Sequence, residues 1–172
     1  MEENESESWF FRARAEADKG VSSGDRFIGI VIVAVSLLFI GIFVAHQICS
    51  TRFFTSKFGI LEMVMLYGGL IAWIITGSLD GIFAKRFLSR LFDVFGGIIF
   101  ILISLIWLLV VFPFEFAFFG DIFSEVLRFL VNWISNDIAR GIMLMGTVLL
   151  SIGGVYSPIA YKFVSVKRFS RE

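Results

Sequence analysis

The chain has 172 residues, of which 58% are hydrophobic and 17% charged, and its formal net charge is zero. A soluble domain has about 45–50% apolar residues, and here the excess lies in long blocks, which indicates membrane helices. The neutral balance, without a basic patch among aromatic residues, argues against nucleic-acid binding. A single cysteine, Cys49, excludes an intramolecular disulfide, and a single histidine, His46, excludes a bis-histidine haem. We therefore expect no cofactor and no metal.

The first 26 residues are polar and contain seven acidic residues. A cleavable signal peptide has a short basic start that leads directly into an apolar run, so we expect residues 1–26 to remain as a polar cytoplasmic segment. Within it, residues 8–19 place Trp9 near Arg12 and Arg14. This pattern fits an interfacial helix on the inner leaflet, and it fits a disordered tail equally well.

Four apolar segments follow, and each is long enough to cross a bilayer. The hydrocarbon core is about 30 Å thick and needs roughly 20 apolar residues in a helix. The segments cover about 27–45, 60–82, 94–112 and 141–162. The sequence therefore predicts an all-α integral membrane protein with a four-helix transmembrane domain over 27–164, followed by a basic cytoplasmic tail at 165–172.

Lysines and arginines in the flanking segments predict the orientation, because they are enriched on the cytoplasmic side. With both termini on one side, eleven of these residues lie on that side, and four lie on the other: Arg52, Lys57, Arg128 and Arg140. We therefore expect a multi-pass protein with both termini, and the loop between the second and third spans, in the cytoplasm.

A surface helix is expected over residues 121–135, between the third and fourth spans. Its polar residues recur at steps of three or four, with apolar residues between them, which is the period of an amphipathic helix. Glu125 and Arg128 share the polar face at a spacing that suits an ion pair. We expect this helix to lie along the outer membrane surface with its apolar face, including Trp133, toward lipid.

Small residues four apart mark candidate helix contacts, because they let two backbones approach closely. Three such pairs occur: Gly77 with Gly81, Gly41 with Ala45, and Gly153 with Ser157. The favoured interpretation is packing of the spans against one another, and the alternative is self-association. Trp73 and Trp107 also lie within spans, where an indole N–H needs a partner, so we expect helix contacts there too.

Asp80 and Asp93 flank the cytoplasmic loop between the second and third spans. The favoured interpretation places both carboxylates at the depth of the lipid head groups, near the basic residues of that loop. The alternative makes them a paired ion or proton site facing a cavity, since ionisable groups deep in a membrane are usually functional.

The sequence contains no recognisable combination of catalytic residues. No Ser–His–Asp set can assemble around the single histidine, and His46 with Cys49 in a short outer loop is a weak case for an activated thiol. We expect no enzymatic activity. The favoured function is a structural or accessory subunit of a larger membrane complex, or a self-associating scaffold. Its partners would be the lipid bilayer and other membrane subunits or itself. The alternative is a small oligomeric transporter or channel that uses Asp80 and Asp93.

Overall fold

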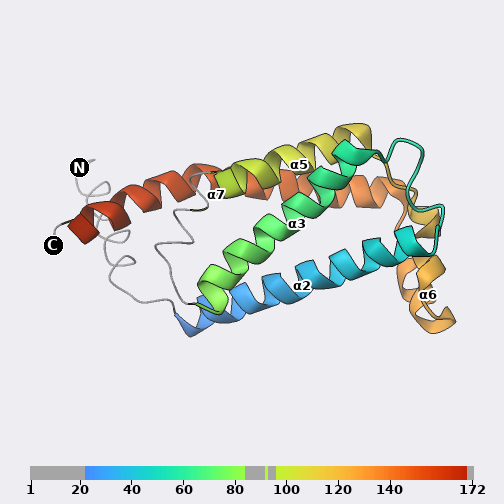
Figure 1. The fold of residues 1–172 in the computed structure, drawn as a ribbon, viewed down its shortest axis with the longest axis horizontal. Coiled ribbons are helices and arrows are strands. Elements are labelled where there is room, and N and C mark those ends of the chain that lie inside the picture. The colour runs from blue at the N-terminus through green and yellow to red at the C-terminus, as the bar shows by residue number, and fades with distance from the viewer. Residues whose placement is uncertain (1–21, 84–91, 93–95, 170–172) are drawn as a thin grey trace, which may run out of the picture.

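The computed structural model describes residues 22–83, 92 and 96–169, and of residues 153 and 155–169 it describes the backbone alone. The elements in chain order are α2 (Ser23–Ile48), α3 (Ile60–Gly81), α5 (Ile98–Val111), the 3-10 helix η2 (Phe116–Ile122), α6 (Glu125–Val131) and α7 (Asn136–Phe169) (Figure 1). This part of the chain is all-helical, which confirms the all-α part of the predicted fold class. The helix considered at 8–19 lies outside the described residues.

The long helices differ in length relative to the thickness of a bilayer. By length and composition alone, α2 and α3 are able to cross a membrane. The apolar helix α5 has 14 residues and spans about 21 Å at 1.5 Å per residue. By contrast, α7 has 34 residues and measures about 51 Å.

The helices form an open array and not a closed bundle. Each long helix packs on its neighbours along the chain, α2 on α3, α3 on α5 and α5 on α7. Within the described residues, the backbones of α2 and α7 do not come into contact. At one end of the array η2 contacts α2, α6 and α7, so the segment between α5 and α7 joins helices that otherwise stay apart.

Local sequence explains where two of these helices begin and end. Ser22 accepts a hydrogen bond from the Asp25 N–H at 3.1 Å and donates its own N–H to the Asp25 carboxylate at 3.3 Å, a reciprocal cap that starts α2. At the end of α5, Phe112 adopts a left-handed conformation with φ of 41°. Pro113 follows, and because proline disfavours a helical residue before it, the helix stops there.

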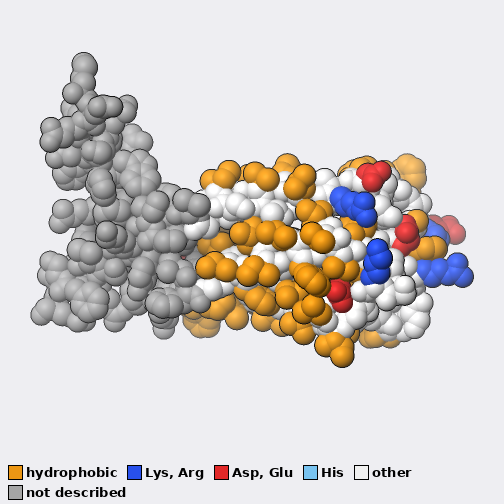
Figure 2. Space-filling view, turned by 90° about the horizontal axis from the view of Figure 1, so that it is seen from above, with side chains coloured by type: hydrophobic (Ala, Val, Ile, Leu, Met, Phe, Trp, Pro, Cys, Tyr) orange, Lys and Arg blue, Asp and Glu red, His pale blue; other side chains and the backbone are white. Residues whose placement is uncertain are grey.

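Apolar side chains remain exposed along the described part of the array. They occur on every long helix, for example Leu38 on α2, Val64 on α3, Val110 on α5 and Leu149 on α7. Figure 2 shows hydrophobic side chains spread over the middle of the molecule and charged side chains gathered at one end of the visible face. A surface of this kind does not suit water, because monomeric soluble proteins rarely expose large continuous apolar areas.

Candidate functional site

A close helix contact is formed where α2 crosses α3 at three glycines, Gly29, Gly77 and Gly81. A methyl group added at Gly29 would lie 2.6 Å from the Gly81 nitrogen and 2.7 Å from the Gly77 oxygen. Any side chain there would collide with backbone, which cannot yield as a flexible side chain can. The two helices therefore approach closely only because all three positions lack a Cβ.

The other predicted packing residues are placed differently. Gly41 is exposed, and a methyl group added there would have nothing within 4 Å, so it makes no close contact within the described chain. Ala45 is half-buried. For Gly153 and Ser157 the structure describes the backbone alone, so their contacts are not shown. Gly29 was not predicted, because the residue four positions later is Val33 and no small-residue pair marks it.

The structure does not show whether Asp80 and Asp93 lie close to each other. Asp80 is half-buried in the last turn of α3, close in sequence to Gly77, and it takes part in an interaction. At the next residue, the Gly81 carbonyl accepts a hydrogen bond from the Arg26 Nε at 3.4 Å. Asp93 lies outside the described residues, so the paired carboxylate site stays a prediction.

A buried carboxylate, Glu62, links α3 to α5. It is 8% exposed, and its Oε1 accepts a hydrogen bond from the Trp107 indole at 3.1 Å, while Oε2 accepts the Gly59 N–H at 3.0 Å. The position in the first turn of α3 also favours a negative charge, since the helix dipole is positive there. The bond to Trp107 is a helix contact of the kind expected for an indole within a span.

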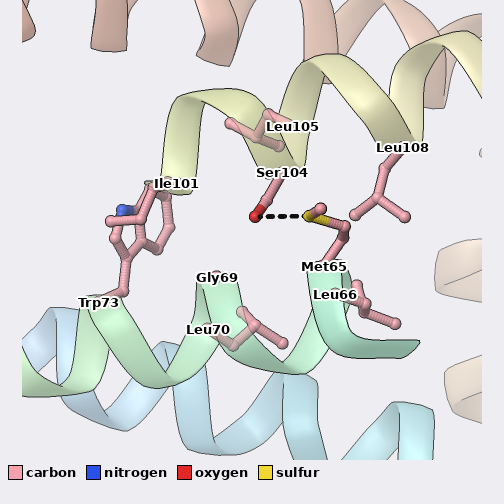
Figure 3. A pocket seen from close by; sticks show the side chains of 9 residues that line it. All are labelled: Met65, Leu66, Gly69, Leu70, Trp73, Ile101, Ser104, Leu105 and Leu108. Atoms are coloured by element: carbon pink, nitrogen blue, oxygen red, sulfur yellow. Dashed lines mark hydrogen bonds between the residues drawn. The ribbon is translucent and has the colours of Figure 1, made fainter. Parts of the chain in front are cut away.

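Beside this contact, α3 and α5 line a partly open apolar pocket of about 90 Å³. Figure 3 shows Trp73 at one side and the facing pair Gly69 and Ser104 in the middle. The Ser104 hydroxyl donates to the Met65 sulfur at 3.5 Å, a weak acceptor. Small residues on both helices thus leave free space, and no charged side chain lines it.

The end of the array where η2 lies is closed by a cluster of aromatic rings, which we call the aromatic cap. It joins the α2–α3 connection to the segment after α5, and its members are His46, Phe43, Phe53, Phe54, Phe58, Phe112, Phe114, Phe116 and Phe119. Two backbone hydrogen bonds fix these segments together: Glu115 N–H to the Phe53 carbonyl at 2.7 Å, and Thr55 N–H to the Pro113 carbonyl at 3.0 Å. The loop after α2 is therefore an ordered part of the cap.

His46 lies at the centre of the aromatic cap, and its side chain is completely buried. Its ring stacks on Phe53 at 4.5 Å between centroids and on Phe119 at 5.7 Å. Its Nδ1 is 2.6 Å from the Thr51 hydroxyl. Cys49 is exposed, so Thr51, and not the thiol, is the partner of the imidazole.

The start of α7 is fastened to the same cap by Asn136. Its side-chain oxygen accepts the Phe116 N–H at 2.8 Å, and its amide nitrogen donates to the Glu115 carboxylate at 2.8 Å. One side chain thereby satisfies a backbone donor and a carboxylate in the segment that leads into η2. Asn136 was not predicted from the sequence, because its partners lie about 20 residues away along the chain.

The helix expected over 121–135 is shorter in the structure. Residues up to Ile122 belong to η2, and α6 covers Glu125–Val131 only. The expected Glu125–Arg128 pair was wrong, because Arg128 bonds to Asp121 at 2.6 Å instead. That contact reaches across Gly120, where a methyl group would lie 2.8 Å from the Arg128 Cγ, so the missing side chain of Gly120 admits Arg128.

No group of three or more His, Cys, Asp or Glu side chains that could hold a metal ion occurs in the part of the chain that the structure describes. No family model matches the sequence, and no curated protein and no solved structure is detectably similar to it. Function is therefore inferred from the sequence and the geometry alone.

Proposed function

We propose that this chain is a non-catalytic integral membrane protein that serves as an accessory subunit of a larger membrane complex or as a self-associating scaffold. In this proposal α2, α3, α5 and α7 are the four spans, both termini are cytoplasmic, and the aromatic cap lies on the opposite side. The apolar lengths of α2 and α3 support it, as do the exposed apolar side chains on all four helices.

The open array is the observation that carries the proposal. In a closed four-helix bundle every helix has two neighbours, whereas here α2 and α7 each leave one flank without a helix among the described residues. Helix association in membranes depends on close packing more than on apolarity, and an open flank offers a long surface for such packing. The two end helices are therefore where we place contacts with another subunit or another copy.

Site-directed photo-crosslinking in native membranes tests this placement. A photoreactive residue at Leu38 on α2 or Leu149 on α7, both exposed, is expected to give an adduct with a second protein. The same residue at Ala72, which is buried in α3, is the matched control and is expected to give none. Adducts with lipid alone at both exposed positions would contradict the proposal.

Mass spectrometry of the complex after mild detergent extraction distinguishes the two forms of the proposal. A constant set of other membrane proteins identifies an accessory subunit, and a defined homo-oligomer identifies a scaffold. A monomer that carries only lipid, after extraction in several mild detergents, would exclude both forms.

A small oligomeric transporter or channel is the alternative function. The observation that favours it is Asp80, a half-buried carboxylate in the last turn of a helix able to cross a membrane. In liposomes, this function requires that Asp80→Asn abolishes ion or proton flux while the protein still folds. An accessory subunit or scaffold requires that the same substitution leaves assembly unchanged.

A further inference from the structure

His46 is a titratable group that the fold encloses completely within the aromatic cap. Its side chain has no exposed surface, and Nε2 has no hydrogen-bond partner within the described residues. This site accommodates a neutral imidazole, because one ring nitrogen is hydrogen-bonded to Thr51 and the ring faces pack on phenylalanines. An imidazolium needs two acceptors, since both of its nitrogens carry hydrogen.

The charges around the cap do not supply the second acceptor. The Phe119 backbone carbonyl and the Asp121 carboxylate, both in η2, lie near the ring and favour its charged form. Neither is a hydrogen-bond partner of Nε2 in the closed cap, and Arg128 of α6 already holds one Asp121 oxygen at 2.6 Å. Three other charged groups near the cap have partners of their own: Arg52 lies over Phe118, Arg140 over Phe112, and Glu115 is bonded to Asn136. The phenylalanine faces that stack on the ring attract a cation only weakly in comparison with the water that it would lose.

We propose that the aromatic cap is an acid-sensitive latch, which closes around neutral His46 and opens when this imidazole takes up a proton. The proton comes from solvent and binds the ring nitrogen in the open form, where water can hydrate the charge. The open form thus binds one proton more than the closed form, so acid shifts the equilibrium toward opening. Opening separates the two segments that the Phe53–Glu115 and Thr55–Pro113 hydrogen bonds join.

The expected size of the effect follows from one proton and the ordinary titration of an exposed imidazole near pH 6.5. Between pH 7.5 and pH 5.0 the opening equilibrium should rise about 30-fold. Hydrogen exchange measures it directly on the full chain in lipid nanodiscs, through the amides of Thr55 and Glu115. Protection factors are compared, because they remove the pH dependence of intrinsic exchange. Amides in the middle of α3 are the internal reference and should not respond.

Two variants distinguish the contribution of His46 to the acid response from that of the neighbouring Asp121 carboxylate. His46→Phe keeps an aromatic ring between Phe53 and Phe119 but cannot take up a proton, so protection should stay constant from pH 7.5 to 5.0. Asp121→Asn keeps the imidazole and removes the ion pair with Arg128, so the acid response should persist. Survival of the response in His46→Phe, or its loss in Asp121→Asn, would overturn the proposal.

A second measurement needs no variant. His46 is the only histidine in the chain, so its imidazole nitrogen signals are unambiguous in a ¹⁵N-labelled sample. The closed cap is expected to show a neutral imidazole at pH 5.0, where an exposed histidine is charged. Titration of these signals near pH 6.5 without any change in cap protection would show that the cap accepts the charge, and the latch would be refuted.

Discussion

Three glycines determine how closely α2 and α3 approach, and the chain also contains a glycine that tests this interpretation. Gly77 faces the Gly29 carbonyl, whereas Gly41 has no neighbour within 4 Å of an added methyl. Both lie in helices, so a substitution at either changes backbone propensity in the same way. A difference between them therefore reports the helix contact.

We expect Gly77→Ala to lower the free energy of unfolding by about 1–3 kcal/mol, the usual cost of forcing extra atoms into a packed contact. The methyl group would lie 2.8 Å from the Gly29 oxygen, so the helices must separate. Gly41→Ala is the matched control and should leave stability unchanged or slightly raised. Reversible unfolding in mixed micelles measures both, and equal losses would show that the crossing is not specially sensitive.

Trp107 offers a second test of a single contact. In Trp107→Phe the Glu62 Oε1 loses the indole donor, so the free energy of unfolding should fall, because an acceptor that loses its partner destabilises the folded state. Trp133→Phe is the control, because that indole bonds to the Leu130 carbonyl within its own segment and is exposed. Thermal unfolding should show a clear loss for the first variant and little change for the second. Matching changes would exclude a structural role for the Glu62–Trp107 bond.

Among the elements, α6 stands apart because it buries none of its residues in the described structure. It projects from the capped end of the array, across the direction of the long helices (Figure 1). Val126 and Leu130 are exposed on it, and Arg128 ties it to η2 through Asp121. A short helix with one apolar face, fixed at the end of spanning helices, is suited to the membrane interface.

Spin labels on the two faces of α6 test this placement. In a Cys49→Ser background, a nitroxide at Val126 should be accessible to oxygen and shielded from a water-soluble nickel complex, as at the boundary of head groups and acyl chains. A nitroxide at Ser124, on the other face, should be accessible to the nickel complex. Equal exposure of both labels to the nickel complex would place α6 in water.

At the scale of the whole molecule, the aromatic cap lies at one end of the helices. In the proposed orientation this end faces away from the cytoplasm. Cys49 is the natural probe, because it is the only cysteine and is exposed beside the cap. An impermeant maleimide applied to the non-cytoplasmic side of sealed membranes should label it. A Ser22→Cys, Cys49→Ser variant, with its cysteine at the opposite end of α2, should react only after permeabilisation. The reverse pattern would invert the topology.

The apolar blocks were sufficient to predict the helical class, because length and composition alone determine which segments need to form helices in lipid. Contacts between segments were harder to predict. Gly29 was overlooked because its small partners lie on another helix and not four residues away. The packing of Phe114 on Phe116 within the aromatic cap was not predicted, since phenylalanine suits lipid and a packed interior equally. The stacking of His46 on Phe119 joins residues 73 positions apart, and no local pattern marks such a distance.

The open array has a consequence for biosynthesis. The glycine crossing draws all of its partners from residues that precede position 83, so this hairpin can form before the later helices leave the ribosome. Each subsequent helix then docks on the one made just before it. The ring cluster at the far end instead requires residues near position 46 to meet residues near position 119, so it cannot close before α5 and η2 have been made.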